Sequence, residues 1–226
     1  MPDFRYAQFC PLARAAEVLG NRWSLLILRE LMLGPQRFSD LKRRLPGVST
    51  SVLAERLSTL EGFGVVTPEQ LPPPAAARVY GLTARGRSAR PALLALARWG
   101  LHWLGPMGAD DHFEPEWLRL SIEAFAAPGP TPARRFELHV GSGPSAVRLR
   151  FAGGPRGLHF LADDAPADVV VRAAPQHLLG VLTGLLPPDA ARAQGVSIDG
   201  DASALADLPS QFRFDFPNRE TQGVTS

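Results

Sequence analysis

The chain has 226 residues, 45% of them hydrophobic, with a formal net charge of +2 and one cysteine. One cysteine excludes an internal disulfide framework, and no apolar run approaches the length that spans a bilayer. The first residues lack the charged start and apolar run of a secretion signal, so we expect a cytoplasmic protein without a membrane partner. The length predicts two domains.

The basic residues are concentrated in the first half of the chain. Residues 1–110 hold 14 Lys and Arg against 8 Asp and Glu, a net charge of +6, whereas residues 111–226 carry 10 against 14, a net charge of −4. A basic field attracts phosphates, so only the first half is suited to nucleic acid.

Residues 38–66 contain two amphipathic helical patterns joined by a turn, Leu45-Pro46-Gly47-Val48. Leucines recur at helical spacing on both sides of this turn, which gives each helix one buried stripe. Ser49 occupies the N-cap position of the second helix. Thr50 and Ser51 then form an exposed N-terminal turn, and small hydroxyl side chains there fit the major groove of DNA. The pattern predicts a helix-turn-helix.

Two short runs with strand character follow, Val65 to Thr67 and Arg78 to Leu82, around a Pro- and Ala-rich tip. They predict a hairpin wing from which Arg78 reaches a phosphate or the minor groove. The next segment predicts an apolar helix that Pro91 kinks or restarts. Its side chains either pack on their own core or form a dimer surface, and we favour the dimer; they are Leu93, Leu96, Ala97, Trp99, Trp103 and Leu104.

The motifs of the first half together resemble the HxlR-type winged helix-turn-helix regulators. The matching segments are Cys10-Pro11, LGNRWSLLILREL (19–31), GPQRFSDL (34–41), VLAERLSTLEGFGVV (52–66), RVYGLTARG (78–86) and Arg98-Trp99. The resemblance implies a homodimeric bacterial transcription factor that binds a palindromic operator in double-stranded DNA. Three consecutive prolines at the wing tip, Pro72 to Pro74, depart from the family pattern.

The candidate DNA-binding residues combine the reading helix, the wing and nearby cations. The resemblance puts Arg37 and Ser39 near the DNA backbone, Ser49 to Ser51 and Arg56 on or near the reading helix, and Arg78 in the wing. Lys42 and Arg43 are added to this set because they lie beside the turn. The full set is Arg37, Ser39, Lys42, Arg43, Ser49, Thr50, Ser51, Arg56 and Arg78.

Cys10 precedes the first predicted helix. Some members of the resembled family sense oxidants or electrophiles through a cysteine at this end, which makes Cys10 a redox candidate. The alternative is a partly buried small hydrophobic residue, and we favour it because only Arg5 and Arg14 lie near enough in sequence to activate the thiol.

The second half predicts a helix over residues 116–126, three strands at 136–140, 146–151 and 158–161, and then a strand, helix, short helix, strand and helix over 167–208. Alternating apolar residues in the first strands predict an antiparallel sheet with one buried and one solvated face. The closing order resembles the sterol carrier protein 2-like (SCP2-like) lipid-binding fold.

That second resemblance implies a cavity between the sheet and the apolar helix that carries Leu178 to Leu186, suited to an apolar small-molecule effector. The candidate lining residues are Phe151, Phe160, Leu178, Leu182 and Leu185. A helix packed on a sheet is equally a plain hydrophobic core, and the domain then serves only to hold a dimer together. We favour ligand sensing because Gly180 and Gly184 leave room beside the sheet.

No catalytic constellation is found in the sequence, so we predict a protein that is not an enzyme, without cofactor or metal. No two histidines share a helix face at the spacing of a zinc site. Asp199-Gly200-Asp201 lacks the other oxygen ligands of a calcium loop, and Asp201 is better explained as the cap of the last helix.

These observations predict an α+β chain: a winged helix-turn-helix domain over residues 1–108, an SCP2-like domain with an antiparallel-rich sheet covered by helices over 109–217, and a flexible tail over 218–226. The favoured function is a homodimeric transcriptional regulator that responds to an apolar molecule. The alternative is an apolar-ligand carrier whose first half serves only for dimerisation.

Overall fold

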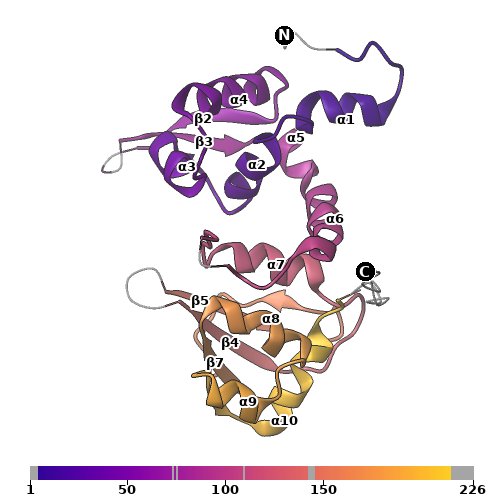
Figure 1. The fold of residues 1–226 in the computed structure, drawn as a ribbon, viewed down its shortest axis with the longest axis vertical. Helices are drawn as coiled ribbons and strands as arrows, with labels where there is room; N and C mark the ends of the chain where they lie inside the picture. Colours follow the sequence, from indigo (N-terminus) through magenta and orange to yellow (C-terminus); the bar gives the residue numbers. More distant parts are fainter. Residues whose placement is uncertain (1–4, 73, 75, 109, 142–145, 215–226) are drawn as a thin grey trace, which may run out of the picture. The chain divides into compact units, whose positions relative to one another are not determined.

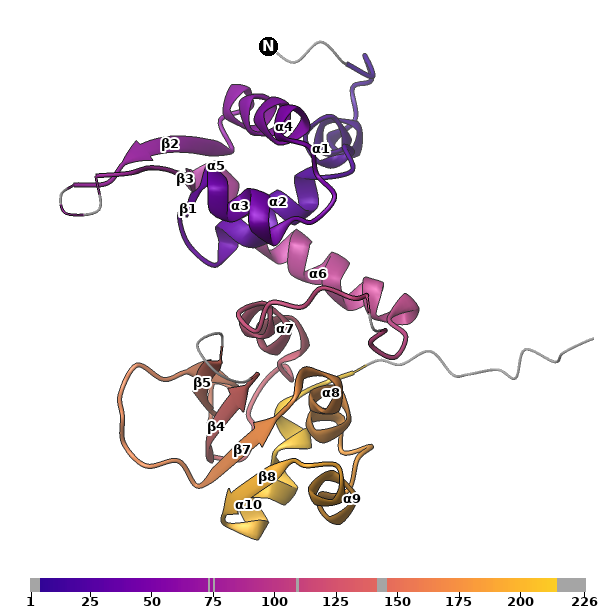
Figure 2. The ribbon, with the colours of Figure 1, turned by 60° about the vertical axis from the view of Figure 1, so that its left-hand side comes forward.

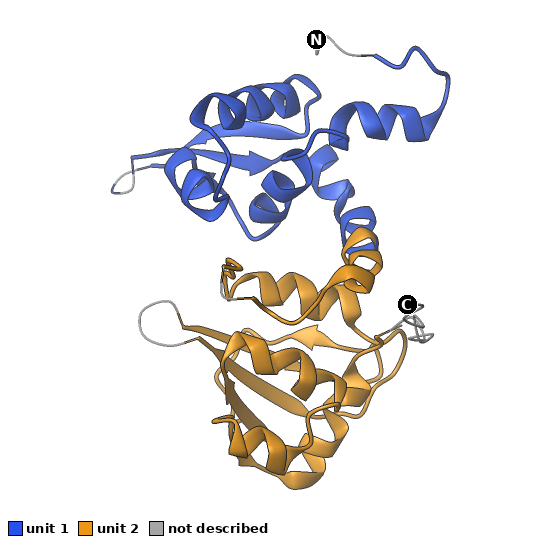
Figure 3. Ribbon diagram, viewed as in Figure 1, with its two compact units in different colours: residues 1–95 blue, residues 96–226 orange. Residues whose placement is uncertain are grey.

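A computed structural model describes residues 5–72, 74, 76–108, 110–141 and 146–214. The chain forms two compact units, Met1–Ala95 and Leu96–Ser226 (Figure 3). The expected boundary after residue 108 stays a prediction, and the expected flexible tail lies outside the described residues. Within the described part, no helix is both long and apolar enough to cross a membrane.

Unit 1 combines short helices with a small antiparallel sheet whose strand order is β1-β3-β2 (Figure 1). In chain order the elements are α1 (Pro11–Leu19), α2 (Ser24–Met32), β1 (Gln36–Arg37), α3 (Phe38–Arg44), α4 (Thr50–Gly62), β2 (Val66–Gln70), β3 (Arg78–Leu82), α5 (Ala84–Ser88) and α6 (Arg90–Gly100), the last of which continues past residue 95. The predicted winged helix-turn-helix fold is therefore confirmed.

The core of unit 1 is built by leucines at helical spacing. Leu53, Leu57 and Leu60 of α4 are fully buried, and they join Leu41 of α3 and Leu28 of α2 in one cluster. Each such side chain contributes about 1.5–3 kcal/mol on burial. The predicted stripe is thus the face by which α4 is anchored, which leaves its opposite face exposed.

The helix that follows the wing is restarted where Pro91 predicts it. α5 ends at Ser88, and α6 begins at Arg90 with Pro91 in its first turn. Proline is tolerated there because a backbone N–H in the first turn has no acceptor within the helix. α6 stops at Gly100, so Trp103 belongs to a separate single turn, η1 (Leu101–Trp103). The predicted helix was too long because glycine is a poor helix former.

Unit 2 contains a mixed sheet with the strand order β6-β5-β4-β7-β8. The elements are α7 (Trp117–Phe125), β4 (Arg135–Val140), β5 (Val147–Ala152), β6 (His159–Phe160), β7 (Val169–Ala173), α8 (Pro175–Thr183), α9 (Pro188–Ala193), β8 (Ser197–Gly200), α10 (Ala202–Asp207) and η3 (Pro209–Gln211). The pairs β4–β5, β5–β6 and β7–β8 are antiparallel, but β4 and β7 are parallel. The sheet is therefore not wholly antiparallel, because β7 enters beside β4 rather than at an edge.

One face of this sheet carries the hydrophobic core. Phe136 and Leu138 of β4 lie opposite Phe151 and Leu149 of β5, and the rings of Phe136 and Phe151 stack with centroids 5.2 Å apart. Side chains from α7, α8, α9 and α10 join the same cluster. Figure 2 shows α8 and α9 on one side of the sheet and the segment that leads into β7 on the other.

The opposite face is charged but only partly solvated, which corrects the expectation of one wet face. Glu137 and Arg150 are both buried there. Glu137 accepts hydrogen bonds from Arg148 at 2.8 Å and from Arg150 at 2.9 Å, and Arg150 also donates to the carbonyl of Ala165. The segment before β7 covers these charges, which can be buried because they are paired.

The apolar helix of unit 2 is shorter than predicted. α8 ends at Thr183 because Gly184 adopts a left-handed conformation, φ 73°, and so caps the helix. Leu185 consequently lies outside α8 and is 74% exposed, so it does not face the sheet. Its inclusion among the cavity-lining residues is wrong.

Candidate nucleic-acid interface

The interface is built around the turn between α3 and α4. Leu45 and Val48 of this turn are buried, whereas Pro46 and Gly47 are exposed. Gly47 has φ 87°, a left-handed conformation that strains any residue with a β-carbon. The turn therefore depends on this glycine to reorient the chain between the two helices.

The N-terminus of α4 is capped by a serine, as predicted. Ser49 Oγ accepts a hydrogen bond from the backbone N–H of Val52 at 3.2 Å, and it lies 3.1 Å from Ser51 Oγ. Ser49, Thr50 and Ser51 are all exposed. The first turn of this 13-residue helix thus presents hydroxyl groups and the positive end of the helix dipole to solvent.

The candidate DNA-binding residues on and before α3 are exposed to different degrees. Arg37 is exposed at the N-cap of α3, and Ser39 is exposed beside it. Lys42 is half-exposed, and Arg43 is exposed while forming an ion pair with Asp40 at 3.0 Å. Among the described residues neither Arg37 nor Lys42 has an ion pair, so both side chains are available to an external anion.

Two further arginines, one on α3 and one on α4, form ion pairs within the protein. The side chain of Arg44 is 10% exposed and lies 3.5 Å from the buried carboxylate of Glu30 on α2. The side chain of Arg56 is 16% exposed and pairs with Glu55. Sequence position does not reveal the partner of Arg44, because that contact is set by the packing of α3 against α2.

The wing, formed by β2 and β3, follows α4 in the chain. β2 and β3 pair from Val66 opposite Leu82 to Gln70 opposite Arg78, so the hairpin is longer than the predicted strand at 65–67. Pro68 is tolerated inside β2 because β2 is an edge strand. Arg78 is exposed, with its guanidinium 5.7 Å from the ring centre of Tyr80.

β1 pairs with strand β3 of the wing. Its residue Arg37 lies opposite Val79 of β3, next to Arg78. Because successive side chains of a strand point to opposite faces, Arg37 shares a face of the sheet with Val79, and Arg78 lies on the other face. At the tip, Pro73 and Ala75 lie outside the described residues, so the effect of the three prolines is not addressed by the structure.

The predicted ligand residues of unit 2 separate into three groups. Phe151, Leu178 and Leu182 are buried together in the core. Phe160 is half-buried beneath the guanidinium of Arg119, which lies 4.3 Å from its ring centre. Leu185 is on the surface, as described above.

Cys10 is half-buried at the N-cap of α1, where the backbone is extended. Its carbonyl oxygen accepts a hydrogen bond from the backbone N–H of Arg14 at 3.1 Å. Cys10 lies at the start of α1, as expected, and the structure leaves its redox role as a prediction.

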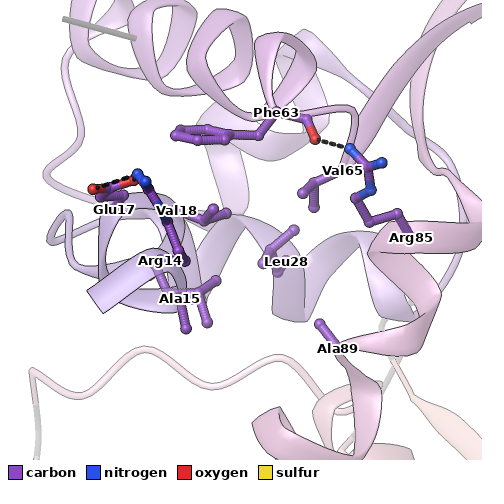
Figure 4. Close-up of a pocket in the computed structure, with 10 residues that line it drawn as sticks. Arg14, Ala15, Glu17, Val18, Leu28, Phe63, Val65, Arg85 and Ala89 are labelled. Atoms are coloured by element: carbon purple, nitrogen blue, oxygen red, sulfur yellow. Dashed lines mark hydrogen bonds and ion pairs between the residues drawn. The ribbon is translucent and has the colours of Figure 1, made fainter. Parts of the chain in front are cut away.

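A pocket in unit 1, at the C-terminal end of α4, was missed by sequence reasoning. It is formed by α1, α2 and the residues that join α4 to the wing and α5, and Arg14 and Arg85 lie at its edges (Figure 4). The lining residues come from distant parts of unit 1 and share no motif. Only the packing of the helices reveals the pocket.

A helix that follows a tight turn and carries exposed hydroxyl side chains in its first turn, together with a hairpin wing, defines a winged helix-turn-helix, a class of DNA-binding protein. The model of the HxlR-like helix-turn-helix family matches residues 18–107. The uncharacterized HTH-type transcriptional regulator sll1512 of Synechocystis sp. is 40% identical over 103 residues, which cover 46% of this chain and 76% of that protein. The chain therefore belongs to the HxlR-like helix-turn-helix family of transcriptional regulators.

Further relatives cover the same part of the chain. The uncharacterized HTH-type transcriptional regulator YvaP of Bacillus subtilis is 36% identical over 105 residues, which cover 46% of this chain and 97% of YvaP. The structure of the reduced form of the transcriptional regulator YodB from B. subtilis is similar at 32% identity, with a TM-score of 0.38, over 45% of this chain and all of that one. The two sequence relatives, sll1512 and YvaP, are named as regulators, and they give the carrier alternative no support.

Proposed function

We propose that the protein is a homodimeric regulator that binds palindromic duplex DNA through two copies of α4. The observation that carries this proposal is the exposed, Ser49-capped N-terminus of α4, preceded in the chain by the cations Arg37 and Lys42, which form no ion pair with the described residues. A recognition helix places its N-terminal residues in the major groove, and nearby cations neutralise phosphates.

The side chains have different roles in this proposal. Thr50 and Ser51 approach base edges, and Ser49 holds the helix end in place. The cations and hydroxyl around α3 contact the phosphate backbone, and Arg78 of the wing contacts a phosphate or the minor groove. Arg56 acts next to the reading face. Because Arg56 is paired with Glu55, its attraction to a DNA phosphate is weaker than that of Arg37.

The dimer is proposed to form through the apolar residues of α6 and η1. Leu96, Trp99, Trp103 and Leu104 are exposed, and the rings of Trp99 and Trp103 lie edge to face with centroids 4.4 Å apart. Large exposed apolar groups of this kind mark contact surfaces. Trp99→Asp is expected to shift the protein from dimer to monomer in sedimentation velocity, and an unchanged dimer would rule this surface out.

Unit 2 is proposed to have the SCP2-like fold and to bind an apolar effector between its sheet and α8. The succession α8, α9, β8 and α10 supports this, because it follows the order of helix, short helix, strand and helix expected from the resemblance. Phe151, Leu178 and Leu182 are the remaining candidate contacts, with Phe160 at the margin. Native mass spectrometry of protein purified from its host should detect a retained apolar guest.

The regulatory function is tested by fluorescence anisotropy with a palindrome from the region upstream of the protein's own gene. Two half-sites about 34 Å apart, one helical turn, are expected to bind with an affinity that falls steeply with salt. Increasing the spacing by half a turn should abolish the tight complex. Equal affinity for the palindrome and for unrelated DNA would contradict sequence-specific regulation.

Arg37→Ala is the informative variant in this assay, and Arg192→Ala is its matched control. Arg192 is also an exposed arginine near a helix end, but it belongs to unit 2 and pairs with Asp189 at 3.3 Å. Only the Arg37 variant is expected to lose affinity. A loss of the same size in both variants would point to net charge rather than to the proposed interface.

A further inference from the structure

The pocket in unit 1 has the size of a small-molecule site. Its volume is about 340 Å³, and its walls include Ala15 and Val18 of α1, Leu28 of α2, and Phe63 and Val65, which connect α4 to β2 (Figure 4). Sites for small ligands have volumes of about 300–1,000 Å³ and mostly apolar walls. This pocket therefore fits a compact apolar molecule.

The charges at the edges of this pocket are unevenly compensated. On one side, Arg14 donates to both carboxylate oxygens of Glu17, at 3.1 and 2.8 Å, and Glu17 also accepts from the backbone N–H of Tyr6 at 2.9 Å. The charges of Arg14 and Glu17 therefore cancel. Figure 4 shows this pair across the pocket from Arg85.

Arg85, on the other side of the pocket, has no counter-charge within the described part of the chain. It is exposed, and one of its terminal nitrogens donates to the carbonyl of Phe63 at 2.9 Å. No carboxylate pairs with it among the residues that the structure describes. A guanidinium has five N–H donors in a planar fork that matches a carboxylate, so Arg85 keeps donors for a ligand.

We propose that this pocket binds a small apolar acid, an aromatic or short aliphatic molecule with one carboxylate. The apolar body packs against Val18 and Phe63, which are only half-buried, and the carboxylate accepts hydrogen bonds from Arg85. This site is separate from the effector site proposed for unit 2, and binding of the acid does not depend on any role in transcription.

A guest in this pocket contacts the junction between the reading helix and the wing. Phe63 caps the C-terminus of α4, and Thr83 Oγ1 donates to the carbonyl of Gly64 at 2.7 Å, which ties that junction to the start of α5. An acid that binds one arrangement of α4 and the wing more tightly than another changes DNA affinity by that difference. This coupling, unlike the binding itself, rests on the proposed function.

The test uses the full-length protein and two pairs of probes: 1-naphthoate with 1-naphthalenemethanol, and octanoate with 1-octanol. Calorimetric titration is expected to show that at least one acid binds about tenfold more tightly than its alcohol, since only the acid can pair with Arg85. Methyl NMR should show shifts at Val18, Leu28 and Val65. No binding up to the solubility limit, equal affinities for acid and alcohol, or shifts confined to Leu178 and Leu182 would each overturn the proposal.

Three variants locate the binding determinants. Arg85→Gln keeps an amide donor for the Phe63 carbonyl but lacks the charge, so the acid should bind only as tightly as the alcohol. Ala15→Phe fills the pocket from α1 and should abolish binding of both. Arg87→Gln is the matched control, because Arg87 lies on the same helix and donates to the carbonyl of Leu82 outside the pocket lining. Its affinities should equal those of the wild type.

The variants also separate this proposal from the regulatory one. Circular dichroism melting confirms that each variant folds, and operator affinity without probe is measured for each. Acid binding that is unaffected by both Arg85→Gln and Ala15→Phe would disprove the site, whatever the operator affinity. Loss of specific operator binding by the wild type would instead disprove the proposed function and leave acid binding in place.

Discussion

Ser49 Oγ and the backbone N–H of Val52 are joined by a 3.2 Å hydrogen bond that caps the reading helix. Ser49→Ala removes the acceptor and is expected to lower the free energy of unfolding of unit 1 by about 1 kcal/mol. Ser49→Asp keeps an acceptor at the cap, so stability should be close to that of the wild type. Urea unfolding followed by the methyl resonances of Leu53 and Leu57, which lie in the core of unit 1, measures both values.

The same two variants should act differently on DNA. The carboxylate of Ser49→Asp lies where phosphates approach in the proposed complex, so operator affinity should fall by more than tenfold although the helix is capped. Ser49→Ala should retain most of the affinity. If Ser49→Asp binds the operator as tightly as the wild type, the N-terminus of α4 is not in the groove.

Arg37→Ala and Arg56→Ala should differ because only one of these cations is open to solvent. Arg37 is exposed, whereas the side chain of Arg56 is 16% exposed and paired with Glu55. Arg37→Ala is expected to reduce the slope of log affinity against log salt by about 1, the value for one lost phosphate contact. Arg56→Ala should change it less. A larger effect at Arg56 would mean that its pairing with Glu55 breaks on DNA.

The buried ion pair of Arg44 and Glu30 predicts that substitution of Arg44 lowers stability. Arg44→Met preserves the apolar part of the side chain but removes a charge 3.5 Å from a fully buried carboxylate. Loss of one partner of a buried pair costs about 3–5 kcal/mol. We expect the lower end of this range, because Arg29 still pairs with Glu30 at 2.7 Å.

Arg43→Met is the control for this substitution. Arg43 precedes Arg44 in α3, but its side chain is 68% exposed and its ion pair with Asp40 is a surface pair. Such pairs contribute about 0–1 kcal/mol, so the unfolding free energy should hardly change. Similar losses in both variants would show that the Arg44–Glu30 contact is not the cause.

The charged face of unit 2 predicts acid sensitivity. The hydrogen bond from Arg148 and a second from His139 lower the pKa of Glu137 from 4.5 to about 2. Because the pKa is lower in the folded state, the stabilisation is complete above about pH 4.5 and is lost as the pH falls towards 2. Glu137→Gln should flatten the stability of unit 2 over this range.

Urea midpoints at pH 7, 4.5 and 3, followed by the methyl resonances of Leu138 and Leu149, measure this dependence. Asp189→Asn serves as the control, because Asp189 is an exposed carboxylate of the same unit. It should preserve the pH dependence of the wild type. A Glu137→Gln variant with the same acid sensitivity as the wild type would assign that sensitivity to other carboxylates.

Local patterns in the sequence predicted the helix-turn-helix, the Ser49 cap, the wing and the restart at Pro91, because each follows from side-chain spacing or backbone preference within a few residues. The exposed segment at Thr50 and Ser51 was predictable for the same reason. The cap of α10 was equally local: Asp201 accepts from the backbone N–H of Ser203 at 2.8 Å.

Tertiary structure alone decided which cations are available and where a ligand can enter. Lys42 and Arg44 look alike in the sequence, yet only Arg44 meets a buried carboxylate, on a helix 14 residues earlier in the chain. The parallel pairing of β4 with β7 and the unit 1 pocket likewise depend on contacts between distant segments. Residue spacing determines local conformation, but charge compensation and cavities depend on which distant groups the packed chain brings within a few ångströms.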